Sequence, residues 1–110
     1  MMIETGDDWR MLQNPDLNQI MTVLRQQLPA LTDEYHVRSI GVFGSFVRHE
    51  ENPESDVDLL VTFDETPGLI KFIKLENHLS DQLGIKVDLV MEEALKPNIA
   101  SQVLSEVVRI

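Results

Sequence analysis

One stretch in the middle of the sequence constrains the fold of this chain more than any other. An apolar run at 40–43 stops at Gly44-Ser45, and ten residues then separate Ser45 from a pair of aspartates, Asp56 and Asp58. We expect the run to be a strand that leads through the Gly-Ser turn into a helix. The first backbone N–H groups of a helix have no helical partner and attract phosphate. The sequence therefore predicts a phosphate-binding turn at Gly44 and Ser45.

The two aspartates open the next predicted strand. Residues two apart on a strand point to the same face, so Asp56 and Asp58 present their carboxylates in one direction and form a seat for a hard cation. Magnesium is usually held by a few carboxylates together with substrate phosphates, which is what transfer from a nucleoside triphosphate requires. The alternative is a simple turn with a solvated acidic face.

The remaining elements follow from apolar spacing and from turn residues. A helix is predicted to begin at Pro15 with Asn14 as its cap, and Pro29 should end or bend it. We expect strands at 37–43, 57–63 and 86–90, a short helix at 45–50, a long helix at 69–83, and helical spacing from Leu95 to Val107. The predicted class is α/β (α+β), with a small mixed sheet of three strands and flanking helices. It forms one domain over 14–110, preceded by a flexible segment at 1–13.

The connections between the strands predict where the polar residues meet. A long helix between the second and third strands favours parallel pairing, and the shorter link between the first and second permits antiparallel pairing. The end of the first strand and the beginnings of the other two would then share one edge of the sheet. This edge adds Asp88 as a third carboxylate, although alone it would be an ordinary polar residue on an edge strand.

Charge and composition exclude several classes of protein. A formal net charge of −10 over 110 residues argues against direct nucleic-acid binding, which needs Lys and Arg to neutralise phosphates, and suits a basic partner better. No apolar run approaches the length of a membrane span, and no basic start with an apolar block suggests a secretory signal. The absence of cysteine suits a reducing compartment. We expect a cytoplasmic protein without membrane contact.

The combined motif resembles a known family. Gly44-Ser45, the ten-residue gap, and Asp56-Val57-Asp58 running into Leu-Leu-Val resemble the minimal nucleotidyltransferases of the DNA polymerase β-like superfamily, over about residues 15–110. The short single-domain form is similar to the antitoxin partners of HEPN-domain toxins. Those antitoxins are thought to inactivate the toxin by transferring AMP from ATP to one of its tyrosines. One departure is His49-Glu50, where the family more often has Gly-Glu, and this bears on how the nucleotide is positioned.

The resemblance implies roles for six residues. Three aspartates would be catalytic and bind Mg²⁺, with Asp56 and Asp58 bridging the metal to the phosphates of ATP and Asp88 completing a second metal site or accepting a proton. The nucleotide-binding residues would be Gly44, Ser45 and Arg48. For Arg48 the alternative is a surface ion pair with a neighbouring glutamate, which would contribute little.

Three functions fit these features. The first is an AMP-transferring antitoxin that uses Mg²⁺ and ATP and forms a hetero-oligomer with a cognate HEPN-domain toxin. The second is a nucleotidyltransferase for a small cationic acceptor such as an aminoglycoside, and the lack of a second, substrate-binding domain weighs against it. The third is a non-catalytic antitoxin that occludes its toxin. Against it stand three converging carboxylates, which repel one another unless a cation joins them.

Overall fold

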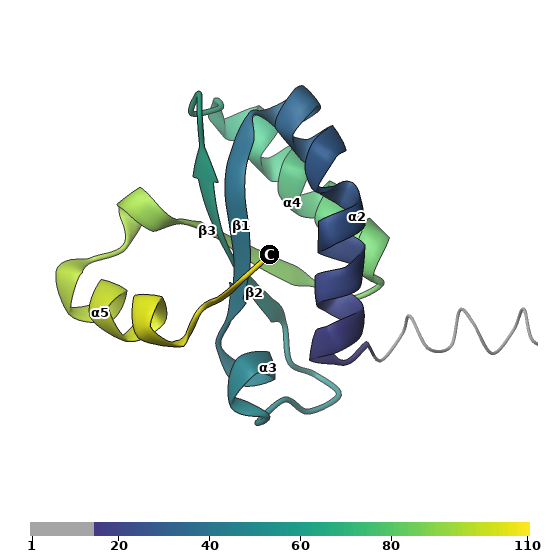
Figure 1. Ribbon diagram of the computed structural model, residues 1–110, viewed down its shortest axis with the longest axis vertical. Coiled ribbons are helices and arrows are strands. Elements are labelled where there is room, and N and C mark those ends of the chain that lie inside the picture. Colours follow the sequence, from purple (N-terminus) through teal and green to yellow (C-terminus); the bar gives the residue numbers. More distant parts are fainter. Residues whose placement is uncertain (1–14) are drawn as a thin grey trace, which may run out of the picture.

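A computed structural model describes residues 15–110, so the expected cap Asn14 and the expected flexible segment lie outside the described part. The elements, in order, are α2 (Leu17–Tyr35), β1 (Val37–Phe43), α3 (Ser45–Arg48), β2 (Val57–Phe63), α4 (Leu69–Leu83), β3 (Val87–Met91), the 3-10 helix η1 (Glu92–Ala94), α5 (Pro97–Glu106) and β4 (Val108–Arg109). Figure 1 shows α2 and α4 on one side of the sheet and α5 on the other.

The sheet has the order β3-β2-β1-β4. Strands β1 and β2 pair antiparallel and β2 and β3 pair parallel, which confirms the pairing expected from the connection lengths. The short strand β4, which pairs antiparallel with β1, was not expected. Helical spacing was predicted to continue to Val107, but α5 ends at Glu106 and the chain turns back onto β1. A two-residue strand carries too little alternation to be recognised in a sequence.

Helix α2 begins and ends differently from the prediction. It begins at Leu17 because Asp16 caps it: the Asp16 Oδ1 accepts the Gln19 N–H at 2.8 Å, and the Gln19 Oε1 accepts the Asp16 N–H at 2.9 Å. The prediction that Pro29 ends or bends the helix was wrong about its end, since the helix continues to Tyr35. A proline removes one helical hydrogen bond, and burial of apolar residues on both sides of Pro29 offsets that loss.

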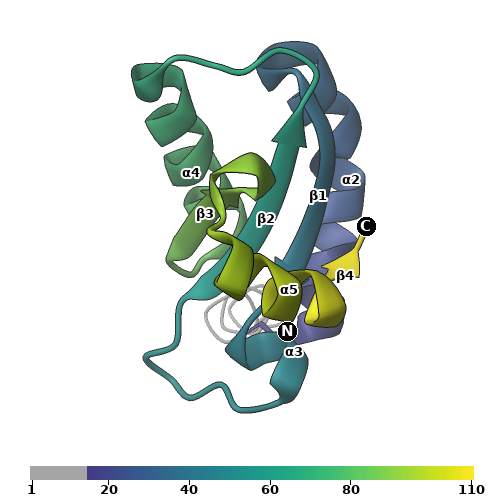
Figure 2. The ribbon, with the colours of Figure 1, turned by 90° about the vertical axis from the view of Figure 1, so that its left-hand side faces the viewer.

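The main core lies between the sheet and the layer of α2 and α4. It consists of almost fully buried side chains from all of these elements, among them Ile20, Leu24, Val37, Ile40, Leu59, Val61, Leu75, Leu79 and Leu89. The opposite face of the sheet is partly covered by α5, as Figure 2 shows. Leu60 of β2 and Val103 of α5 are buried outside the main core, which fits packing of α5 on this second face.

Two contacts hold the outer elements close to the sheet. A Cβ on Gly41 of β1 would lie 2.8 Å from the Val107 Cγ2 and 2.9 Å from the Val108 carbonyl oxygen, so only glycine lets β4 approach. On the other edge, the Glu76 Oε2 of α4 accepts the Leu89 N–H of β3 at 2.9 Å. Glu76 therefore ties α4 to the edge strand and satisfies one of its backbone donors.

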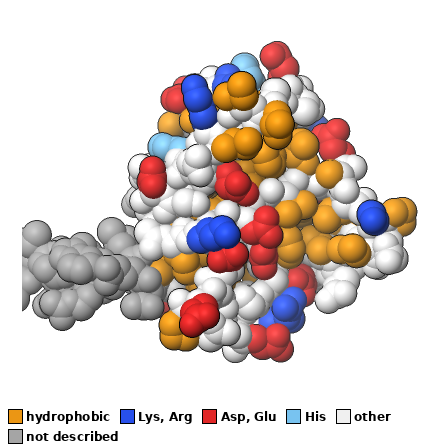
Figure 3. All heavy atoms as spheres, turned by 180° about the vertical axis from the view of Figure 1, so that it is seen from behind, with side chains coloured by type: hydrophobic (Ala, Val, Ile, Leu, Met, Phe, Trp, Pro, Cys, Tyr) orange, Lys and Arg blue, Asp and Glu red, His pale blue; other side chains and the backbone are white. Residues whose placement is uncertain are grey.

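The surface of the described residues combines acidic side chains with apolar ones. Figure 3 shows the face behind that of Figure 1, where red acidic groups are scattered and orange apolar groups gather in the upper and right-hand parts. The large apolar residues that remain exposed lie on α4 and α5: Leu69, Ile70, Ile73, Ile99 and Leu104. Within 15–110, no helix is both long enough and apolar enough to cross a bilayer.

Candidate active site

The predicted site residues lie where β1 ends and β2 and β3 begin. Residue register pairs Phe43 with Asp58 across β1 and β2, and pairs Asp58 with Asp88 across β2 and β3. Alternation along β2 places Asp58 on the face that α5 partly covers, opposite the main core. Asp56 lies just before β2 begins. The topology thus brings the Gly-Ser turn and the aspartates to one edge of the sheet, as the connection lengths predicted.

Gly44 is required by its contact with Asp58. Its backbone has φ 82° and ψ −151°, a conformation essentially restricted to glycine. A Cβ at this position would collide with the Asp58 Oδ2. The Gly44 backbone is therefore packed directly against one of the predicted metal ligands, which places the turn and the carboxylate in a single site.

The carboxylates of the site interact unfavourably in the absence of a cation. The pKa of Asp58 is raised from 3.8 to about 6, first by burial and then by the charges of Asp88 and Asp56; Arg48 lowers it and Glu106 raises it slightly. Burial and the like charges both make the ionised form of Asp58 costly. A cation bound here would relieve that cost, so this set of oxygen donors suits Mg²⁺.

The same residues do not enclose a metal ion by themselves. Within the part of the chain that the structure describes, no three side chains of His, Cys, Asp or Glu lie in an arrangement that could hold one. Magnesium commonly takes one or two carboxylates and completes its octahedron with waters and substrate phosphates. Asp58 is half-buried and Asp88 is exposed, which leaves room for such ligands above the sheet edge.

His49, where the sequence departs from the family motif, lies in the turn after α3. Helix α3 is a single turn, shorter than the 45–50 expected, and His49 ends it with φ 59°. This left-handed conformation favours glycine, so Gly is the less strained residue there, and a side chain costs about 1 kcal/mol. The His49 N–H bonds the Ser45 carbonyl oxygen and so closes the turn.

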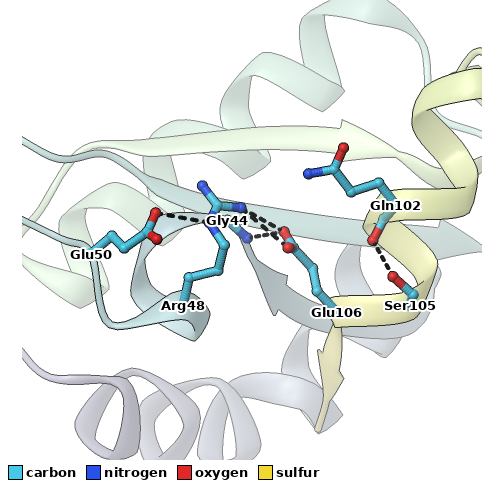
Figure 4. A network of polar contacts seen from close by, with 6 residues as sticks. All are labelled: Gly44, Arg48, Glu50, Gln102, Ser105 and Glu106. Carbon is cyan, nitrogen blue, oxygen red and sulfur yellow. Dashed lines mark hydrogen bonds and ion pairs between the residues drawn. The ribbon is translucent and has the colours of Figure 1, made fainter.

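Arg48 is engaged by two glutamates (Figure 4). Its Nε donates to the Glu50 Oε1 at 3.1 Å, and its Nη1 donates to both carboxylate oxygens of Glu106 at 3.1 Å. These contacts raise the pKa of the Arg48 guanidinium, Glu50 contributing most. The surface ion pair that was the alternative for Arg48 is thus present with Glu50, and its contact with phosphate stays a prediction.

Glu106 is the residue of this site that no sequence pattern pointed to. It lies in the last turn of α5, its side chain is only 16% exposed, and its Oε2 accepts the Gly44 N–H at 2.8 Å. The only available signal was indirect. A negative charge at a helix C-terminus opposes the helix dipole, so a glutamate at that position calls for a contact elsewhere.

Comparisons with known proteins point to one family. Residues 24–110 match the family described as nucleotidyltransferase domain. The chain is 51% identical over 92 residues to the protein adenylyltransferase MntA of Thermococcus cleftensis. The aligned residues cover 84% of this chain and 93% of the relative.

Solved structures resemble the chain over most of its length. One, provisionally described as a minimal nucleotidyltransferase, has a TM-score of 0.73 and 34% identity, over 88% of this chain and 98% of the other. Another is the crystal structure of a toxin–antitoxin with AMP-PNP, with a TM-score of 0.63 and 26% identity, over 84% of this chain and 69% of the other.

Proposed function

The chain belongs to the nucleotidyltransferase domain family and is a nucleotidyltransferase, and from that premise we propose that it is a Mg²⁺-dependent protein adenylyltransferase that acts as an antitoxin. It would transfer AMP from ATP to a hydroxyl, most simply a tyrosine, of a cognate HEPN-domain toxin. The observation that carries the proposal is the convergence of Asp56, Asp58 and Asp88 beside the Gly44 turn at one edge of the sheet.

The residues at this edge of the sheet suit the binding of the triphosphate and of the metal ion. The Gly44 turn and Arg48 would bind the triphosphate, while Asp56 and Asp58 would hold Mg²⁺ against its oxygens. When bound, the metal neutralises charge on the departing pyrophosphate. The phenolic oxygen attacks the α-phosphorus, a P–O bond to it forms, and the bond to pyrophosphate breaks.

Asp88 is the best placed group to take the proton of the attacking hydroxyl. It is exposed, it lies beside Asp58 in the sheet, and a phenol with a pKa near ~10 needs a base or a metal to react at neutral pH. Asp58 is less suited to this role because it is packed against Gly44. In this proposal, Asp58 binds the metal and Asp88 accepts the proton of the incoming hydroxyl.

The relatives of this chain and its net charge support a protein acceptor. A relative that shares half of its residues with this chain is named a protein adenylyltransferase, and a similar structure is a toxin–antitoxin with a bound ATP analogue. The net charge of −10 favours a partner with a basic surface.

The test is label transfer from α-labelled ATP with Mg²⁺ to proteins that co-purify with the chain. We expect label on a partner with the wild type and none with the double variant Asp56→Ala, Asp58→Ala. The double variant Asp33→Ala, Asp81→Ala removes the same charge from exposed positions on α2 and α4, and it should transfer label normally. Silencing of a toxin by all forms without label would instead show an antitoxin that acts by occlusion.

A further inference from the structure

Glu106 binds the Gly44 N–H and the Arg48 guanidinium, the two groups that would bind phosphate in the proposed function. Its carboxylate accepts the Gly44 N–H at 2.8 Å and receives the Arg48 Nη1 at 3.1 Å on each oxygen, as Figure 4 shows. A carboxylate that bridges a backbone N–H and a guanidinium makes the same charge-assisted hydrogen bonds as two oxygens of a phosphate. Both acceptors therefore require the same donors.

The position of Glu106 has no local explanation within α5. The helix dipole disfavours a negative charge in the last turn of the helix. The charge of Glu106 also interacts unfavourably with that of Asp58. The contacts with Gly44 and Arg48 are thus the interactions that hold the side chain in place, and they join α5 to the end of β1.

We propose that Glu106 is an internal competitor of the nucleotide, which occupies the Gly44 N–H and Arg48 until a phosphate of the nucleotide replaces it. This inference rests on the proposed function, because it takes the nucleotide phosphates to bind at the Gly44 turn. The side chain remains 16% exposed, so it can rotate towards solvent while β4 stays paired with β1. Nucleotide binding then replaces the hydrogen bonds between Glu106 of α5 and the Gly44 turn, and Arg48 becomes available to the phosphate.

The competition predicts the direction of a conservative substitution. Glu106→Gln keeps the size of the side chain and its ability to accept the Gly44 N–H, but it loses the charge that binds Arg48. The nucleotide then displaces a neutral group, and we expect its dissociation constant to fall about 10-fold. A shorter side chain cannot span the same gap, so Glu106→Asp should also bind nucleotide more tightly.

A control variant separates the loss of the competing carboxylate from the effect of removing any negative charge. Removing any negative charge makes an acidic chain more attractive to ATP. Glu65→Gln removes one charge at an exposed position after β2, at the opposite end of the strand from Asp58. We expect this variant to change the dissociation constant by less than about 2-fold, because exposed charges at that distance are screened.

The experiment is calorimetric titration of the full chain with AMP-PNP and Mg²⁺, for the wild type, Glu106→Gln, Glu106→Asp and Glu65→Gln. In the transfer assay, Glu106→Gln should lower KM for ATP. Weaker binding by both Glu106 variants would show that Glu106 positions Arg48 for the phosphate, and would overturn the proposal. Equal binding by the wild type and both variants would overturn it too, while leaving the adenylyltransferase function intact. Absence of nucleotide binding in every form would overturn both.

Discussion

Replacement of Asp58 by asparagine should stabilise the metal-free protein at neutral pH. The folded structure raises the pKa of this carboxyl to about 6, first through burial and then through Asp88 and Asp56. A shift of about two units corresponds to about 3 kcal/mol as an upper limit. Because Asp58 is only partly buried and its neighbours are screened by solvent, we expect about 1–2 kcal/mol, or about 5–10 °C in Tm.

The two pKa values of Asp58, folded and unfolded, decide how the stability of the wild type changes with pH. Well below its ordinary pKa of 3.8, Asp58 is protonated in both the folded and the unfolded chain and costs no stability. As the pH rises towards 6, the unfolded chain loses this proton first, so the wild type loses stability progressively, and the loss is complete above the folded pKa. Asparagine cannot ionise. The advantage of Asp58→Asn should therefore be small at pH 4, grow as the pH rises, and become constant above about pH 6.5.

The assay is thermal unfolding in the presence of a chelator, from pH 4 to pH 8, for the wild type, Asp58→Asn and the control Asp33→Asn. Asp33 is exposed on α2, so its variant should follow the wild type at every pH. The reasoning is refuted if the difference between Asp58→Asn and the wild type does not grow with pH, or if the variant is the less stable form at pH 7. The first result would mean that Asp58 is solvated well enough to ionise freely, and the second that its carboxylate stabilises the fold.

Three further substitutions test the supports of the site, each by urea unfolding. Gly41→Ala should destabilise the chain by about 1–3 kcal/mol, since the new Cβ would crowd Val107 and push β4 from the sheet; an unchanged midpoint would show that β4 is dispensable. Glu76→Ala should cost about 1–2 kcal/mol because it leaves the Leu89 N–H without its acceptor, and a cost below about 0.5 kcal/mol would mean that water replaces the carboxylate. His49→Gly should stabilise the chain by up to about 1 kcal/mol by relieving the positive φ, and destabilisation would refute that reading of the turn.

The pairing of the strands was predictable from connection lengths alone. A long helix between β2 and β3 allows a parallel crossover, and no such helix separates β1 from β2. The predictions that were wrong concern details decided by single contacts. Asp16 caps α2 because Gln19 can return the hydrogen bond, and buried residues on both sides of Pro29 carry the helix through it.

The predictable part of the site is the part that is local or follows from topology. Gly44 and Asp58 were found by their spacing, and Asp88 by the edge that it shares with them. Their catalytic and metal-binding roles stay predictions. The structure adds the reason for the glycine, which is the contact with Asp58 rather than the freedom of the turn alone.

Glu106 belongs to a different class of feature, because its role depends on where α5 ends in space. The sequence distance from Arg48 to Glu106 is 58 residues, and no periodicity links them. Two constraints place Glu106 beside Gly44: β4 pairs with β1 directly after α5, and the absence of a side chain at Gly41 lets that strand approach. The short terminal strand thus fixes the end of α5 over the turn. A change at β4 should therefore alter the groups predicted to bind phosphate, even though β4 contributes no side chain to them.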